Sequence, residues 1–328
     1  MHPGHGSPVR DEPAELAIFD IDGPVTAPVS RTIEQAEILD LTIDFITARG
    51  YVAYNTGRAS AIAHRRVISP LLARAQARGI DPGIVSRRVS VFAEKGAVTS
   101  FWDDGLGAWN HRIDPATVVP ADLRDEVAGL LLSDAEFRTY IFVDSDKETM
   151  VSVEMRHETS ERPPVPVTPS VFKPVAERFA AEVRQRASDR GYDNLEVDCT
   201  TIAVDIQCLG VGKDLGARLA FDWLHGLGMR VERVHCFGDS RSDVAMAVEA
   251  RSIMSRWFAD AAERVVYVNV GAPLTIDGDF QVKGFPDMYG RGTVAYLRAC
   301  GLDCQPGADP CKLIADHSSL GPLPWPDG

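Results

Sequence analysis

The sequence lacks the features that mark several classes of protein. It contains no run of about 18 apolar residues, so we expect no membrane-spanning helix. Basic side chains are outnumbered, 34 against 47 acidic ones, and the net charge of −13 disfavours broad contact with nucleic acid or an anionic membrane. A single cleft can nevertheless be positive, so this charge is compatible with a small phosphorylated ligand.

Cysteine is scarce. The six cysteines are scattered, which is typical of a protein in a reducing cytoplasm, and we expect a cytoplasmic location. Cys300, Cys304 and Cys311 lie near one another but lack the paired C-x-x-C spacing of zinc sites, so we interpret them as free thiols. Residues 1–13 are polar, rich in Gly and Pro, and lack the apolar segment of a signal peptide, which predicts a disordered lead-in.

Strands and helices alternate in the outer parts of the chain. With 45% apolar and 25% charged residues, the 328-residue chain has the composition of an ordinary globular protein with a large core. The pattern predicts strands at 16–19, 51–54, 234–237 and 265–270, and helices at 31–49, 60–78, 215–227, 242–250 and 293–299. This alternation is typical of a parallel sheet with right-handed crossovers.

The middle of the chain has a different pattern. It predicts three strand pairs, at 88–93 with 97–102, 139–143 with 149–156, and 195–199 with 202–207, and helices at 121–132 and 171–190. The fold class is therefore α/β: a Rossmann-like parallel-sheet core, residues 14–82 and 209–300, interrupted by an inserted α+β domain at 83–208. From residue 301 on, Pro and Gly are frequent and we expect an irregular tail.

Four polar segments stand at the ends of predicted strands or at the start of a helix. They are Asp20-Ile21-Asp22-Gly23, Asn55-Thr56-Gly57-Arg58, Gly212-Lys213-Asp214 and Gly238-Asp239-Ser240-Arg241-Ser242-Asp243. Ligands of open parallel sheets gather at the carboxyl ends of the strands, so we expect these segments to converge.

This set of side chains suits the transfer of a phosphoryl group. Four carboxylates in one cleft would raise each other's pKa unless a cation were present, and magnesium prefers oxygen ligands. Lys213 adds a positive charge and Thr56 a neutral donor. A carboxylate nucleophile with cationic and hydrogen-bonding groups around the phosphoryl oxygens is what phosphoryl transfer requires.

The four segments, in this order, resemble the signature motifs of the haloacid dehalogenase superfamily of phosphohydrolases. The long insert resembles the large cap domain of its Cof-type and sugar-phosphatase branch. Phe92-Ala93-Glu94-Lys95-Gly96-Ala97 resembles the turn that enters this cap, and Val204-Asp205-Ile206 before Gly212-Lys213 resembles the return to the core. The resemblance implies a Rossmann-like core with an inserted α+β cap domain and phosphatase activity.

The resemblance also implies a role for each motif residue. Asp20 would attack phosphorus and form an aspartyl-phosphate, and Asp22 would protonate the leaving oxygen and then activate water. Thr56 and Lys213 would hold the phosphoryl group. Magnesium would be bound by Asp20, the backbone carbonyl of Asp22, and Asp239, with Asp243 in support.

The candidate substrate-binding residues are less well defined than the motif residues. They are Gly57, Arg58, Glu94, Lys95 and Arg156; for the charged ones, an exposed strand charge or an ion pair is the alternative interpretation. Pro24 departs from the family pattern, which has Thr after Gly23, because Pro removes a backbone N–H and fixes φ.

We therefore predict a magnesium-dependent phosphomonoesterase for a small phosphorylated metabolite, with a sugar phosphate favoured. A phosphomutase of the same fold and a non-catalytic binding protein are the alternatives. The oligomeric state is not indicated by the sequence.

Overall fold

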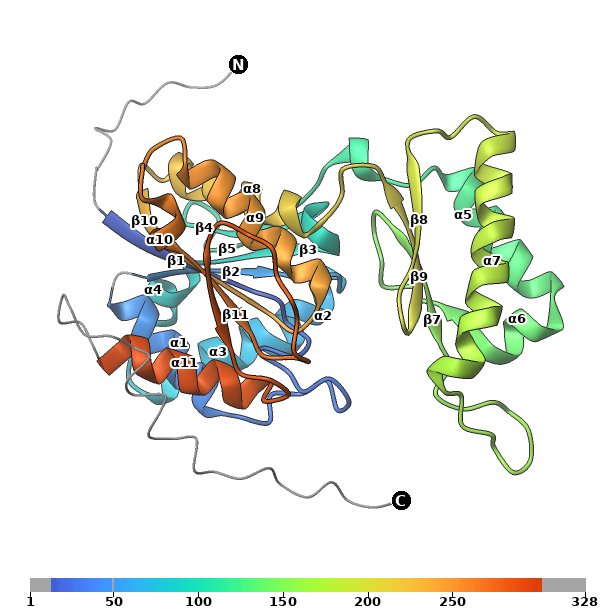
Figure 1. The fold of residues 1–328 in the computed structure, drawn as a ribbon, viewed down its shortest axis with the longest axis horizontal. Coiled ribbons are helices and arrows are strands. Elements are labelled where there is room, and N and C mark those ends of the chain that lie inside the picture. Colours follow the sequence, from blue (N-terminus) through green and yellow to red (C-terminus); the bar gives the residue numbers. More distant parts are fainter. Residues whose placement is uncertain (1–12, 49, 303–328) are drawn as a thin grey trace. The chain divides into compact units, whose positions relative to one another are not determined.

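The computed structural model describes residues 13–48 and 50–302 (Figure 1). The expected lead-in up to residue 12 and the tail from residue 303, with Cys304 and Cys311, lie outside the described residues, as does the side chain of Cys300. Contacts between residues divide the described chain into two compact units. The first unit comprises residues 13–54, 64–90 and 220–302, and the second comprises residues 55–63 and 91–219.

The larger sheet confirms the predicted parallel architecture. Its strand order is β12-β11-β10-β1-β2-β3-β4-β5. The strands are β1 (Pro13–Phe19), β2 (Gly50–Asn55), β3 (Val89–Ala93), β4 (Val98–Asp103), β5 (Ala108–Ile113), β10 (Arg230–Gly238), β11 (Val265–Asn269) and β12 (Gln281–Gly284). β1 pairs in parallel with both β10 and β2, and β10–β11 and β11–β12 are also parallel. β4 and β5 pair in the antiparallel sense.

The register of the sheet determines where the strands end. Phe19 lies opposite Phe237 of β10 and opposite Tyr54 of β2, so the three strands end at the same edge. The rings of Phe19 and Phe237 stack with centroids 4.2 Å apart, and such a pair stabilises the sheet by about 1 kcal/mol beyond its burial. The residues that follow these strands, beginning with Asp20, therefore start from a rigid base.

Helices cover both faces of the sheet in the first unit (Figure 1). They are α1 (Glu37–Thr47), α3 (Ser69–Ala77), α4 (Pro82–Ser86), α9 (Val244–Met254), α10 (Ala261–Arg264) and α11 (Gly290–Leu302). α1 packs against α3 and α11, and α9 packs against β10 and β11. Because both faces are covered, strands such as β2 are buried along their whole length, as the apolar runs predicted.

Two predicted helices have different bounds in the structure. The helix expected from residue 31 begins at Glu37, because Arg31 has a φ of 53° and cannot belong to a right-handed helix. The helix expected at 60–78 is divided into α2 (Ser60–Ala63), a π-helical turn (His64–Ile68) and α3. Pro70 is the second residue of α3 and directly follows the π-helical turn.

The second unit contains a four-stranded antiparallel sheet with helices on one face (Figure 1). Its strands and helices are β6 (Ile141–Val143), β7 (Val151–Met155), β8 (Leu195–Cys199), β9 (Ala203–Cys208), α5 (Ala121–Ser133), α6 (Ala135–Tyr140) and α7 (Pro169–Asp189). Val153 and Ile206 point into a core that includes Phe179. Alternate residues of β7 and β9, Ser152 and Asp205, belong to the opposite, polar face.

The sequence assigned the strands at 88–93 and 97–102 to the inserted domain, whereas the structure places β3 and β4 in the larger sheet. β5 was not predicted, because Ala108–Ile113 is mostly exposed and polar and shows no apolar alternation. The remaining helix, α8 (Lys213–Gly226), follows the four-stranded sheet in the chain.

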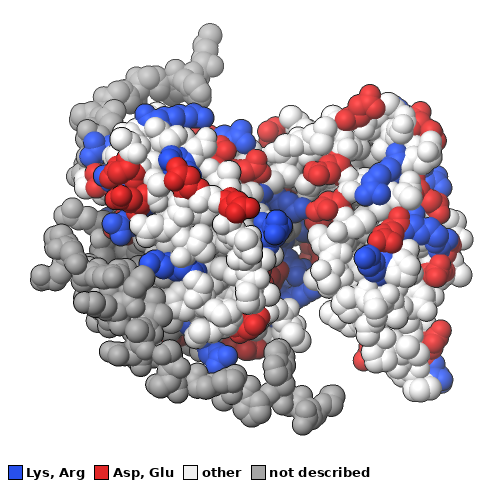
Figure 2. All heavy atoms as spheres, viewed as in Figure 1, with Lys and Arg blue, Asp and Glu red and all other residues white. Residues whose placement is uncertain are grey.

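The surface agrees with the charge balance of the sequence. In the view of Figure 2, acidic and basic side chains are interspersed over each unit. Among the described helices, none is both long and apolar enough to cross a membrane.

Candidate active site

The first predicted motif forms a tight loop at the end of β1. The backbone N–H of Asp20 donates to the carbonyl oxygen of Phe237 at 2.9 Å, which ties the loop to β10. The N–H of Ile21 donates to Oδ1 of Asp20 at 2.7 Å. These bonds fix both the backbone and the carboxylate of the residue predicted to be the nucleophile.

Pro24 fits into this loop, and the backbone hydrogen bonds that close the loop are still made. The N–H groups of Val25 and Thr26 donate to the carbonyl oxygen of Ile21 at 3.1 and 2.8 Å, and the N–H of Gly23 donates to that of Thr26 at 2.8 Å. The hydroxyl of Thr26 also donates to Oδ1 of Asp22 at 3.2 Å. The turn is therefore closed by residues on either side of Pro24, and the ring is buried within it.

The loop after β10 is organised by the buried carboxylate of Asp243. Its Oδ2 accepts hydrogen bonds from the N–H of Asp239 at 3.2 Å and from the N–H and hydroxyl of Ser240 at 3.1 and 2.7 Å. Asp243 thereby holds the backbone of Asp239 in place. This carboxylate supports the loop, and its supporting role at a metal stays a prediction.

Asp20, Asp239 and Asp243 form one group in the first unit, the acidic group. Each offers a carboxylate oxygen, and these oxygens lie within 4.8 Å of one another. The predicted convergence of three of the four carboxylates is thus observed. The side chain of Asp22 is not in this group, and its predicted contribution to a metal is through its backbone carbonyl.

Two glycines allow the backbone to approach Asp239 closely. A Cβ on Gly23, whose φ is +94°, would lie 2.4 Å from Oδ2 of Asp239. A Cβ on Gly271, in the loop after β11, would lie 2.0 Å from the carbonyl oxygen of Asp239. Real Cβ contacts are not this short, so any side chain at either position would displace Asp239.

The three carboxylates affect the pKa of a neighbouring phenol, that of Tyr267. Burial raises the pKa of Tyr267 far above its usual range, and Asp243, Asp239 and Asp20 raise it further. The Tyr267 hydroxyl donates to the carbonyl oxygen of Ser240 at 3.1 Å. The negative potential and the all-oxygen donor set fit a hard divalent cation, for which the acidic group would supply the ligands.

In the second unit, Thr56 and Lys213 are both buried. The hydroxyl oxygen of Thr56 accepts from the N–H of Arg58 at 3.1 Å. Nζ of Lys213, the first residue of α8, donates to the carbonyl oxygen of Asn55 at 2.8 Å. The two residues predicted to hold a phosphoryl group are therefore linked through adjacent residues of one strand end.

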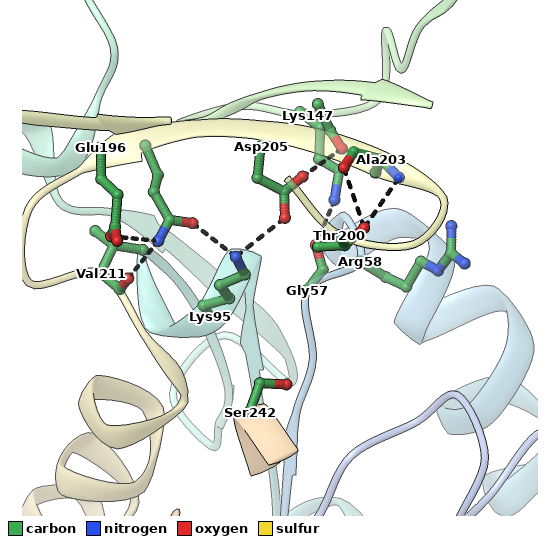
Figure 3. A network of polar contacts seen from close by, with 12 residues as sticks. Gly57, Arg58, Lys95, Lys147, Glu196, Thr200, Ala203, Asp205, Val211 and Ser242 are labelled. Atoms are coloured by element: carbon green, nitrogen blue, oxygen red, sulfur yellow. Dashed lines mark hydrogen bonds and ion pairs between the residues drawn. The ribbon is translucent and has the colours of Figure 1, made fainter. Parts of the chain in front are cut away.

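The polar face of the four-stranded sheet carries a network of charged and amide side chains (Figure 3). Nζ of Lys95 donates to Oδ2 of Asp205 at 3.0 Å and to Oε1 of Gln207 at 2.8 Å. Oδ1 of Asp205 accepts from the hydroxyl of Ser152 at 2.6 Å. Lys95 thus lies against this polar face, and its role in substrate binding stays a prediction.

Arg58 and Lys147 reach the same network. Nη1 of Arg58 pairs with Oε1 of Glu154 at 3.1 Å; the alternative predicted for Arg58 was an ion pair with a core carboxylate, whereas Glu154 lies on β7 of the four-stranded sheet. Nζ of Lys147 donates to the carbonyl oxygen of Gly57. Burial lowers the pKa of Lys147, and Asp205 and Glu94 partly oppose this effect.

Glu94 and Arg156, both predicted to bind substrate, have local partners in the structure. The buried carboxylate of Glu94 accepts from the N–H groups of Glu148, Thr149 and Met150 and from the hydroxyl of Thr149, at 2.6 to 3.0 Å. Nε of Arg156 donates to the carbonyl oxygens of residues 138 and 141. These bonds favour a structural role for both side chains over a direct contact with substrate.

Several residues of these networks were not predicted. Asp205 and Gln207 alternate with buried Val204 and Ile206, and this alternation was the available signal for a polar sheet face. Asn55 follows four apolar positions in a buried strand, which marks it as a buried polar group that needs partners. Lys147 lies in a polar turn and gave no signal.

Comparison with known proteins identifies the fold. No protein-family model and no curated protein matches the chain. The C-terminal domain of trehalose-6-phosphate phosphatase from C. albicans is similar in structure, with a TM-score of 0.60 and 15% identity, over 89% of this chain and 93% of that one. ATP-bound IMP-nucleotidase from Plasmodium falciparum has a TM-score of 0.54 at 10% identity, over 89% of this chain and 61% of that one. This chain has the fold shared by these two proteins.

Proposed function

We propose that this chain is a magnesium-dependent phosphomonoesterase that acts on a small phosphorylated metabolite. The observation that carries the proposal is the acidic group, which gathers Asp20, Asp239 and Asp243 at the ends of two adjacent parallel strands. The loops that present these carboxylates are tied by backbone hydrogen bonds and by close glycine contacts, so their geometry is set before a ligand binds.

The proposed mechanism has two steps. In the first, Asp20 attacks phosphorus and forms an aspartyl-phosphate, while Asp22 gives a proton to the leaving oxygen. In the second, Asp22 takes a proton from the water that attacks the aspartyl-phosphate. The bond between Asp20 and phosphorus breaks, which restores the Asp20 carboxylate and releases inorganic phosphate. The bond from Ile21 N–H to Oδ1 of Asp20 holds the attacking carboxylate in one orientation. We assign the binding of the phosphoryl oxygens to the hydroxyl of Thr56 and the ammonium of Lys213.

We further propose that Asp20, Asp239 and the backbone carbonyl of Asp22 hold the magnesium ion, with Asp243 in support. When bound, the ion supplies positive charge that offsets the carboxylates and the phosphoryl oxygens. The close approach of three carboxylate oxygens, within 4.8 Å of one another, supports this assignment.

The favoured substrate is a sugar phosphate. The polar face of the four-stranded sheet gathers donors and acceptors in a small area, including Lys95, Asp205 and Gln207, which hydrogen-bond to one another; the hydroxyl groups of a sugar are both donors and acceptors and suit such a network. One structural neighbour is named as a trehalose-6-phosphate phosphatase, while the other is named as a nucleotidase, so a nucleotide is the competing substrate class.

A panel of phosphorylated sugars, nucleotides and cofactors tests the proposal. Each compound is incubated with the protein in magnesium and in excess chelator, and free phosphate and the organic product are both measured. Magnesium-dependent release of phosphate from the sugar phosphates is the expected result. An isomerised phosphate ester in place of free phosphate would identify a phosphomutase, and a folded protein that binds but converts none of the compounds would identify a binding protein.

A further inference from the structure

Asn55 makes a reciprocal contact with the predicted phosphate-binding lysine. Its side chain is fully buried, and Nδ2 donates to the carbonyl oxygen of Lys213 at 2.7 Å. In return, Nζ of Lys213 donates to the carbonyl oxygen of Asn55 at 2.8 Å. Two residues separated by 158 positions in the chain are therefore joined at both the backbone and the side-chain end of the lysine.

The contact is made possible by two glycines. A Cβ on Gly216, in the first turn of α8, would lie 2.2 Å from Oδ1, 2.4 Å from Cγ and 2.6 Å from Nδ2 of Asn55. A Cβ on Gly96, whose φ is +99°, would lie 2.8 Å from the backbone nitrogen of Gly216. The end of β2, the turn that contains Gly96 and the start of α8 thus meet at backbone distance. We call Asn55, Gly96, Lys213 and Gly216 the asparagine joint.

We infer that Asn55 is a positioning residue that holds Lys213 in register with Thr56 for binding the phosphoryl group. This inference rests on the proposed function. Lysine has a long flexible side chain, and directing its ammonium requires that both its backbone and its terminal nitrogen be held. Asn55 holds both, and it directly precedes Thr56 in the chain. The amide side chain holds the backbone of Lys213, and the carbonyl oxygen of the same residue holds Nζ, so residue 55 couples the two groups assigned to the phosphoryl oxygens.

A double-mutant cycle distinguishes a packing role for Asn55 from the positioning role. Asn55→Ala removes the amide and leaves space beside Gly216. Gly216→Ala alone forces a methyl group into the Asn55 side chain, whereas in the Asn55→Ala background the same methyl occupies the vacated space. The double variant therefore regains packing but not the hydrogen bond from the amide to the carbonyl oxygen of Lys213, while the bond from Nζ to the backbone of residue 55 is kept in every variant, which separates the two roles.

The variants are compared by thermal unfolding, by kcat/KM for 4-nitrophenyl phosphate in magnesium, and by the affinity for inorganic phosphate in titration calorimetry. We expect Asn55→Ala to lower kcat/KM by about 10- to 100-fold, the cost of a misplaced catalytic group, and to weaken phosphate binding. The double variant should recover the melting temperature of the wild type but keep the loss of kcat/KM and of phosphate affinity. Val183→Ala, which opens a cavity in the distant core of the second unit, is the control for destabilisation alone.

Two results would overturn the inference while leaving the proposed function intact. One is wild-type kcat/KM in Asn55→Ala, and the other is a double variant that recovers activity together with stability. A wild-type protein that neither hydrolyses the ester nor binds phosphate would instead refute the proposed function, and the positioning role would fall with it.

Discussion

The acidic group of the first unit and the polar face of the second are built in different ways. The acidic group is presented by short side chains on loops that are closed by backbone hydrogen bonds and by Gly23 and Gly271. The polar face instead uses long side chains, such as Lys95 and Arg58, that reach their partners as ion pairs. Under the proposed function, chemistry that is common to many substrates would thus be fixed by backbone geometry, whereas selection among substrates would rest on side chains that can be exchanged.

The largest effect is expected from the loss of one charge in the acidic group. Asp239→Asn keeps the side-chain volume but removes the charge of a proposed metal ligand, so we expect kcat to fall by about 10²- to 10³-fold. Magnesium should raise the melting temperature of the wild type through binding to the folded state, and this shift should be lost in the variant. An unchanged magnesium-induced shift would exclude Asp239 as a ligand.

The close backbone contact between Gly271 and Asp239 should affect magnesium binding almost as much as the loss of a metal ligand. Gly271→Ala places a methyl group 2.0 Å from the carbonyl oxygen of Asp239 and must move the loop, so we expect magnesium to bind about 10- to 100-fold more weakly. Gly284→Ala is the matched control, because Gly284, like Gly271, has no positive φ but a Cβ there would meet no atom within 4 Å. The concentration of magnesium that gives half-maximal activity distinguishes the two variants. Equal values would show that the acidic group tolerates movement of its loop.

Exchange of a side chain on the polar face should change selectivity more than rate. Lys95→Ala removes the partner of Asp205 and Gln207, so we expect KM for the best substrate of the panel to rise by about tenfold. The kcat for 4-nitrophenyl phosphate, which has no sugar hydroxyl groups, should change by less than about threefold. A proportional loss on both substrates would place Lys95 with the chemical step.

The smallest effect is expected on the melting temperature, from a side-chain pair that belongs to neither the acidic group nor the polar face. Glu15 lies 3.3 Å from Nε2 of His235, and this hydrogen bond lowers the pKa of the Glu15 carboxyl from its ordinary value of 4.5. Because the folded-state pKa is depressed, the stabilisation is present above pH 4.5 and is lost as pH falls through the lower, folded-state value. Glu15→Gln should therefore lower the melting temperature near pH 6 by no more than about 2 °C, since Glu15 is half exposed.

Melting curves of wild type and Glu15→Gln between pH 6 and pH 3 check this sign. The difference between the two proteins should shrink as the solution becomes more acidic. A difference that grows toward low pH would show that the pair contributes in the opposite sense.

The sequence predicts the parts of this molecule that depend on local rules. Apolar runs such as Leu16–Phe19 indicate buried parallel strands, and acidic residues directly after such runs must lie at the sheet edge. The start of α1 was misplaced because the apolar stripe continues through residues 31–36, while the positive φ of Arg31 is set by the loop around it. β5 was missed because its pairing with β4, and not its own composition, makes it a strand.

The polar networks of the second unit could be predicted only in part. Lys95 was a candidate because it lies in a recognisable turn, but its partners Asp205 and Gln207 depend on which face of β9 meets that turn. The same applies to Glu94, whose four hydrogen bonds come from a segment more than 50 residues away. Long-range partners of this kind follow from the packing of elements and leave no periodic signal in the sequence.

The central claim is tested most directly by Asp20→Asn. Wild type and variant are purified in parallel and compared on the best substrate of the panel, with magnesium and with excess chelator, after both are shown to be folded by thermal unfolding. The account predicts magnesium-dependent phosphate release by the wild type and a loss of at least about 10⁴-fold in the variant, as expected when a nucleophile is removed. Comparable release by Asp20→Asn, or release by the wild type that persists in excess chelator, would contradict it.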